Sequence, residues 1–88
     1  MEVEVGRVTH FFNKISVAVV ELTGELEVGD EIVIKGHTTN FRQKVTSMQI
    51  EHRNIEKAGP GQAIGLKVID RVRVGDRVYK VISESDSE

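Results

Sequence analysis

Two aspartates stand in matched settings in this sequence, Asp30 in Val28-Gly29-Asp30 and Asp76 in Val74-Gly75-Asp76. A pair of carboxylates could serve general acid–base catalysis. Each copy, however, leads directly into alternating apolar residues, and a Gly followed by an Asp is typical of a turn whose carboxylate bonds the local backbone. We therefore predict that both aspartates cap turns that start strands, and that neither is catalytic.

No other combination of residues predicts an active site or a metal site. The histidines His10, His37 and His52 lack metal-ligand spacing, and the sequence contains no Cys. No Ser stands in a Gly-x-Ser-x-Gly turn, and no Gly-x4-Gly-Lys-Ser/Thr loop is present to cradle phosphates. The segment 13–16 begins like the guanine-reading motif Asn-Lys-x-Asp, but Ser16 replaces the Asp. We predict a protein that is not an enzyme and uses no metal, cofactor or nucleotide.

The segment 35–44 is the strongest candidate for a binding surface, because it is the most basic stretch and surrounds one aromatic residue, Phe41. Arg42 and Lys44 are two residues apart and would share one face of a strand. Basic side chains on phosphates, with a base stacked on Phe41, would suit single-stranded RNA. The alternative is a solvated hairpin whose Phe41 closes one end of the core. The predicted RNA-binding residues are Arg7, Lys35, Phe41, Arg42 and Lys44.

A second basic cluster, Arg71, Arg73 and Arg77, lies beside the second Val-Gly-Asp turn. Acidic residues around the first turn could pair with it. Because such pairs usually lie on solvated surface, we expect no specific role for this cluster.

Length and composition allow one small domain. The 88 residues include 22 Val plus Ile against six Leu plus Ala, and branched side chains favour an all-β fold. The net charge is −2, and three of the acids lie in the segment 83–88, so the remainder carries −2 + 3 = +1. We predict an acidic disordered tail over 83–88 and a folded domain over 1–82. No signal peptide or long apolar run is seen, which predicts a cytoplasmic protein without a membrane partner, and the plentiful Glu, Lys and Arg suggest a thermophilic source.

Apolar alternation predicts six or seven short strands and no helix. The expected strands cover residues 3–12, 15–22, 31–35, 41–50, 62–69 and 77–82, and the segment 51–57 is ambiguous. Within 15–22 the apolar phase changes from Val19 to Val20, which predicts a bulge that helps to close a barrel. Strands of this number and spacing form a closed barrel or a sandwich.

Four motifs in order resemble a known barrel. They are Val5-Gly-Arg-Val8, then Gly24-Glu-Leu-Glu-Val-Gly-Asp-Glu-Ile-Val-Ile-Lys-Gly36, then Ala58-Gly-Pro-Gly-Gln-Ala-Ile-Gly-Leu66, and finally Val72-Arg-Val-Gly-Asp76. This order resembles the second domain of elongation factor Tu and related translational GTPases over residues 3–82. The resemblance implies a single closed six-stranded Greek-key β-barrel. It also implies a pocket for the terminal adenosine of aminoacyl-tRNA at Asp30, Ile34 and Gly36, although Pro60 departs from the family's loop.

The same residues also resemble the small barrel at the C-terminus of the U32 peptidase family, with its paired Gly-Asp turns. Two functions follow from the two resemblances. The first is a non-catalytic binding module that contacts RNA, the ribosome or a translation factor. The alternative is a protein-interaction or accessory subunit of an enzyme, like the barrel appended to U32 peptidases. A barrel that self-associates through an edge strand is a third possibility.

Overall fold

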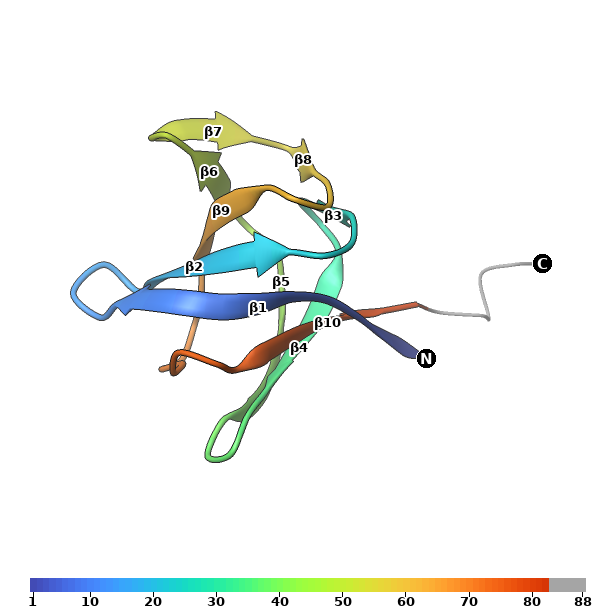
Figure 1. Cartoon of the computed structure of the whole chain (residues 1–88), viewed down its shortest axis with the longest axis vertical. Helices are drawn as coiled ribbons and strands as arrows, with labels where there is room; N and C mark the ends of the chain where they lie inside the picture. Colours follow the sequence, from blue (N-terminus) through green and yellow to red (C-terminus); the bar gives the residue numbers. More distant parts are fainter. Residues whose placement is uncertain (83–88) are drawn as a thin grey trace.

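The computed structural model describes residues 1–82, and the tail predicted for 83–88 lies outside the described residues. Within this range the chain is all-β, as the composition predicts, and its strands are short apart from the first (Figure 1). The strands are β1 (Glu2–Phe12), β2 (Val17–Leu22), β3 (Leu26–Glu27), β4 (Glu31–Lys35), β5 (Asn40–Lys44), β6 (Met48–Ile50), β7 (Arg53–Ile55), β8 (Lys57–Ala58), β9 (Ala63–Lys67) and β10 (Arg77–Val81).

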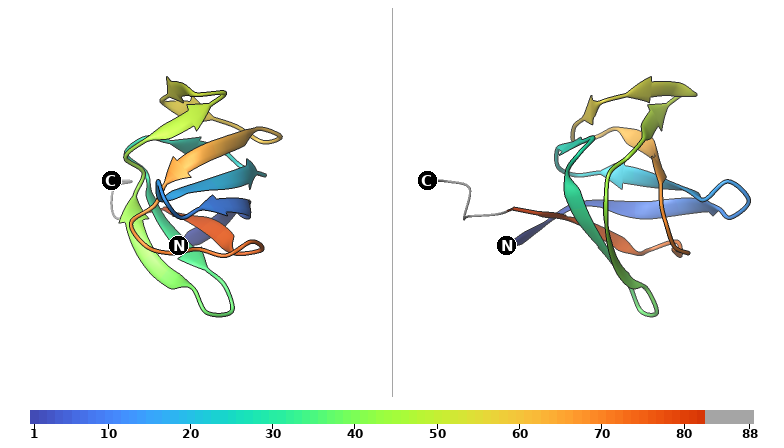
Figure 2. Two further views of the ribbon diagram at one scale, coloured as in Figure 1. Left: turned by 90° about the vertical axis from the view of Figure 1, so that its left-hand side faces the viewer. Right: turned by 180° about the vertical axis from the view of Figure 1, so that it is seen from behind.

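Eight of these strands form one antiparallel sheet in the order β5-β4-β10-β1-β2-β9-β6-β7, and β3 pairs with β8 in a separate two-stranded sheet. The large sheet wraps round a single core (Figure 2). The N-terminal and C-terminal strands, β1 and β10, are neighbours at its centre. Both ends of the folded chain are therefore held in the middle of the sheet.

The prediction of a closed six-stranded barrel is not confirmed, because among residues 1–82 no backbone ladder joins the two ends of the sheet. The strand predicted over 41–50 is interrupted at residues 45–47, so β5 pairs with β4 while β6 pairs with β9. A side chain bridges β5 to the chain around the end of β9. The buried Gln43 donates from Nε2 to Lys67 O at 2.9 Å and accepts at Oε1 from Ile69 N at 2.8 Å.

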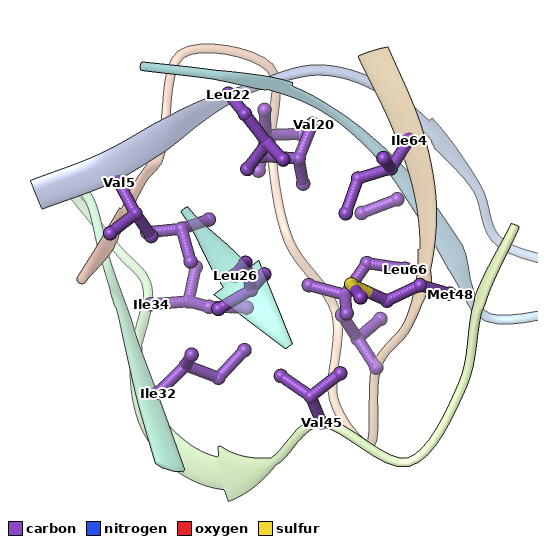
Figure 3. Packing of buried hydrophobic residues seen from close by; sticks show 14 of the residues in the cluster. Val5, Val20, Leu22, Leu26, Ile32, Ile34, Val45, Met48, Ile64 and Leu66 are labelled. Carbon is purple, nitrogen blue, oxygen red and sulfur yellow. The ribbon is translucent and has the colours of Figure 1, made fainter. Parts of the chain in front are cut away.

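The core lies inside this curved sheet and consists of aliphatic side chains (Figure 3). Leu26 from β3 reaches its centre together with Ile32 and Ile34 from β4, and all three are fully buried. Phe11, Phe41, Ile50 and Ile55 pack against this cluster from its edges. Branched side chains stiff at χ1 lose little freedom on burial in such a core, which is consistent with the Val and Ile bias of the sequence.

The predicted bulge in β2 is wrong, and the irregularities lie in β1 instead. The ladder between β2 and β9 runs without a shift, whereas the register of β1 shifts between Glu4 and Gly6 against β10 and between Val8 and His10 against β2. The small residue Ala18 is the fully buried partner of Val20 on the inner face of β2, while Val17 and Val19 face outward. The alternation of large apolar residues suggests a change of phase only because it does not mark the small residue Ala18 as buried.

Candidate functional site

The two Val-Gly-Asp segments form the same capped turn. Asp30 Oδ2 accepts from Glu27 N at 2.9 Å, and Asp76 Oδ2 accepts from Arg73 N at 2.8 Å. Each turn contains one glycine, Gly29 in the first and Gly75 in the second. Their φ values are 100° and 97°, which a residue with a Cβ rarely adopts. The predicted capping role of both aspartates is confirmed.

The two carboxylates then differ in their surroundings. Asp30 is partly exposed, with Lys80 Nζ at 4.0 Å, whereas Asp76 is only 4% exposed and packs against the backbone of Gly36. They lie on different loops and contact different groups, so they do not form a pair that could share a proton.

The residues predicted for the adenosine pocket, Asp30, Ile34 and Gly36, lie in three different surroundings. Ile34 is fully buried in the core, and its side chain therefore cannot line a surface pocket. Asp30 caps the turn before β4, while Gly36 follows β4 at its other end and lies against Asp76. Asp30 and Gly36 thus lie at opposite ends of β4 and do not meet at one site.

Three of the four predicted RNA-binding cations are paired with acids on the outer face of the sheet. Lys35 Nζ lies 2.7 Å from Glu2 Oε1, and Arg42 Nε lies 3.1 Å from Glu31 Oε2. Two further pairs, Arg7 with Glu21 at 3.5 Å and Arg77 with Glu4 at 3.0 Å, each join two neighbouring strands. These pairs lower the net positive charge that this face could offer to phosphates. Lys44 is exposed and stands opposite Glu31 in the ladder.

Phe41 does not lie on the same face as its basic neighbours. It stands opposite the buried Ile34 in the ladder between β4 and β5 and packs against the core. Arg42 and Lys44 point to the other side of β5, because successive side chains alternate between faces. Phe41 is therefore partly buried at the edge of the core, which is the position that the hairpin interpretation predicts.

A polar hollow lies between the β4–β5 hairpin and the loop that connects β9 to β10. Its volume is about 280 Å³, and the side chains that line it come from residues 38–41 and from Asp70, Arg71 and Arg73. The sequence places these two segments some thirty residues apart, and no spacing pattern links them. Their proximity is a consequence of the sheet order, in which β4 lies between β5 and β10.

A second, apolar groove lies over the outer face of β2, β9 and β6, with a volume of about 210 Å³. Phe12 and Ile15 stand at one end and are 46% and 57% exposed, while Glu51 and His52 stand at the other. Gly65 lies on this face, where a Cβ would come within 3.3 Å of the Val17 side chain. The lack of a side chain at Gly65 therefore leaves the floor of the groove open.

Backbone strain is concentrated beside this groove. Within residues 1–82 the non-glycine residues with positive φ are Ser16 at 57°, Glu51 at 52° and His52 at 65°. All three lie in the β1–β2 and β6–β7 connections, which border the groove. Such conformations cost of the order of 1 kcal/mol or more each and are enriched at binding sites.

The described residues contain no cluster of three or more His, Cys, Asp or Glu side chains that could hold a metal ion. Within residues 1–82 there is also no helix with the length and hydropathy needed to cross a membrane.

Known proteins of much greater length contain a segment similar to this chain. No protein-family model matches it. An uncharacterized protease of Methanocaldococcus jannaschii is 47% identical over 79 residues, which are 89% of this chain and 19% of that protein. A collagenase of Porphyromonas gingivalis is 41% identical over 81 residues, which are 90% of this chain and 20% of the collagenase. The chain spans about a fifth of the length of these relatives.

Two solved structures share the fold. Both are of the C-terminal domain of a protein described as a U32 peptidase from Geobacillus thermoleovorans, one of them as a selenomethionine variant. The variant has a TM-score of 0.81 over 85% of this chain and 95% of that domain, and the other 0.83 over 89% and 91%, each at 22% identity. The resemblance to the U32 barrel is thus supported, whereas the resemblance to elongation factor Tu is not.

Proposed function

We propose that this chain is an accessory, protein-binding domain of a U32-type peptidase and does not itself cleave peptide bonds. The observation that carries this proposal is the match of nearly the whole chain to about a fifth of two larger proteins named as a protease and a collagenase. The residues that cleave the peptide bond would then lie in the other four-fifths of such a protein.

The surface of the domain supports a binding role. The outer faces of β4, β10 and β1 carry cross-strand ion pairs, and the body as a whole is close to neutral. The apolar groove beside Phe12 and Ile15 exposes large side chains in a rim of polar residues, which is typical of protein-interaction sites. A rigid sheet with such a groove can hold a polypeptide without supplying chemistry.

A chimera of the Porphyromonas gingivalis collagenase tests the proposal. Its matched segment would be deleted in one variant and replaced by this chain in another, and cleavage of denatured collagen would be compared with cleavage of a short fluorogenic peptide. We expect the deletion to slow cleavage of the long substrate about tenfold more than that of the short one, because binding energy away from the scissile bond is lost. The chimera should restore the rate, and a chimera with Phe12→Ser and Ile15→Ser should restore less of it.

Two results would contradict the proposal. One is a deletion variant that cleaves both substrates as fast as the intact collagenase, since the segment would then have no accessory role. The other is peptide hydrolysis by this chain alone. A deletion variant that loses both activities equally would assign the segment to folding, not to substrate binding.

RNA binding by Arg7, Lys35, Phe41, Arg42 and Lys44 stays a prediction. Because three of these cations are held by acids, its test belongs at low salt, where phosphate contacts are strongest. Binding of a single-stranded RNA oligonucleotide that is weakened by Arg42→Ala with Lys44→Ala would favour the RNA function over the accessory one.

A further inference from the structure

The polar hollow between the β4–β5 hairpin and the β9–β10 loop has no role in the function proposed above. It lies at the end of the molecule where the hairpin projects (Figure 1). Thr38, Thr39 and Asn40 line it from the hairpin, and Arg71 and Arg73 line it from the loop. The hollow therefore collects hydrogen-bond donors from two segments on opposite sides.

Arg71 and Arg73 differ from the other arginines on this part of the molecule. Arg7, Arg42 and Arg77 each lie within 3.5 Å of a carboxylate oxygen. No carboxylate within residues 1–82 forms an ion pair with Arg71 or Arg73. Their charges are thus available to a ligand.

One acid, Asp70, also lines the hollow. Its Oδ1 accepts from Arg71 N at 2.7 Å, so that oxygen is already used by the backbone of the loop. Two guanidinium groups against one carboxylate leave a net charge of +1 at the site. The site is therefore suited to a single anionic group and not to a run of negative charges.

Both walls of the hollow are held in place by buried contacts. Val72 is 2% exposed and anchors the loop between the two arginines, while Asp76 Oδ2 accepts from Arg73 N. On the hairpin side, Thr39 is 6% exposed, and Gly36 N donates to Thr39 O at 2.7 Å. The contact between Asp76 and Gly36 joins the two walls. The backbone of both walls therefore needs little ordering when a ligand enters, which favours binding.

We propose that this hollow binds one carboxylate of a polypeptide, an Asp or Glu side chain, between Arg71 and Arg73. The planar guanidinium fork matches a carboxylate with two parallel hydrogen bonds, and the hydroxyl of the exposed Thr38 can donate to its free lone pairs. The inference deepens the proposed function, on which it rests, by naming an acidic residue of the bound protein as its ligand.

The structure favours a peptide carboxylate over RNA at this position. Phe41 is the aromatic residue at the hollow, and its ring packs against the core, so it offers little surface to a base. A volume of about 280 Å³ suits a side chain, whereas single-stranded RNA is normally held along an extended basic groove with stacking platforms.

Two blocked tripeptides that differ in one group test the proposal on the full chain. Acetyl-Ala-Glu-Ala-amide and acetyl-Ala-Gln-Ala-amide would be titrated at equal ionic strength while the backbone amide resonances are followed by NMR. We expect the Glu peptide to shift the resonances of residues 38–41 and 70–73 with a Kd in the range of about 1–10 mM, as for one charged pair. The Gln peptide should bind at least tenfold more weakly.

Matched charge variants complete the test. The double variant Arg71→Gln with Arg73→Gln should weaken binding of the Glu peptide at least tenfold. The control variant Arg53→Gln with Lys57→Gln removes the same charge from β7 and β8, at the opposite end of the molecule, and should leave binding of the Glu peptide unchanged (Figure 1). Equal weakening by both variants, or equal binding of the two peptides, would overturn the proposal. Inorganic phosphate or an oligouridine that shifts the same resonances at a tenfold lower concentration would also overturn it, in favour of a phosphate ligand. None of these readouts depends on the collagenase chimera, so the two proposals can fail separately.

Discussion

The carboxylate of Asp76 occupies the space where a side chain on Gly36 would begin. A Cβ built on Gly36 would overlap both Oδ1 and Cγ of Asp76. The same carboxylate caps its own turn through Arg73 N, so it cannot move away without losing that bond. This contact fixes the end of β4 against the start of β10 and makes the two loops one unit.

Gly36→Ala should therefore destabilise the domain. The added methyl group must displace a buried, hydrogen-bonded carboxylate, and overpacking of this kind typically costs about 1–3 kcal/mol. Urea unfolding followed by circular dichroism would measure the loss. Gly59→Ala is the matched control, because a Cβ there meets no atom within 4 Å and the residue does not need a positive φ. Equal losses for the two variants would show that Asp76 can yield to the methyl group.

The two capping aspartates should contribute unequally to stability. Asp30→Ala removes a partly exposed cap, for which we expect a loss of about 0.5–1 kcal/mol. Asp76→Ala removes a buried acceptor and leaves Arg73 N without its partner, for which we expect about 1–3 kcal/mol. The free energy of unfolding in urea checks both values. A larger loss for Asp30→Ala would mean that the contact of Asp76 with Gly36 adds nothing to its turn.

Gln43 should be essential to the join between β5 and β9. Its amide donates to Lys67 O and accepts from Ile69 N, so Gln43→Leu would leave both groups without these partners and cost about 1–3 kcal/mol. Gln43→Glu keeps the acceptor for Ile69 N but places a carboxylate against the carbonyl oxygens of Lys44 and Lys67, and we expect a larger loss. The amide of Ile69 should exchange faster with deuterium in Gln43→Leu, which removes its acceptor. Unchanged exchange would show that the amide of Gln43 does not hold this edge.

The β class, the turns and most strand positions could be predicted from alternation and from the Gly-Asp pairs, because these patterns are local. Ala18 shows where such reasoning fails, since a small core residue is not distinguished from a surface one and its neighbours are then assigned to the wrong face. Val33 shows the opposite case, an apolar residue that is buried outside the core. It is 5% exposed yet absent from the core cluster, and it lies opposite Arg42 and Tyr79 on the outer face of the sheet.

The candidate site could not be predicted, because Thr38 and Arg71 meet only through the sheet order. For the same reason, the sequence could not predict most of the ion pairs that the predicted RNA-binding cations form. Lys35 and Glu2, for instance, are 33 residues apart in the sequence and meet across β10, which lies between their strands.

The ion pair between Glu2 and Lys35 should be visible in the titration of Glu2. The hydrogen bond from Lys35 Nζ holds the pKa of Glu2 below its ordinary value of 4.5, with smaller contributions from the charges of Lys35, Arg42 and the N-terminus. A carboxylate whose pKa is lowered by folding contributes stability above its unfolded pKa, and this contribution is lost as the pH falls through the folded value. Lys35→Met should raise the pKa of Glu2 toward 4.5, and the difference in stability between the two proteins should shrink below that pH. NMR titration of the Glu2 carboxyl carbon measures the pKa, with Lys44→Met as a control that leaves it unchanged. If the pKa of Glu2 is the same in Lys35→Met as in the unmodified chain, the ion pair makes no contribution to this pKa in solution. The positive charge of Lys35 on the outer face would then be less compensated than the contacts indicate.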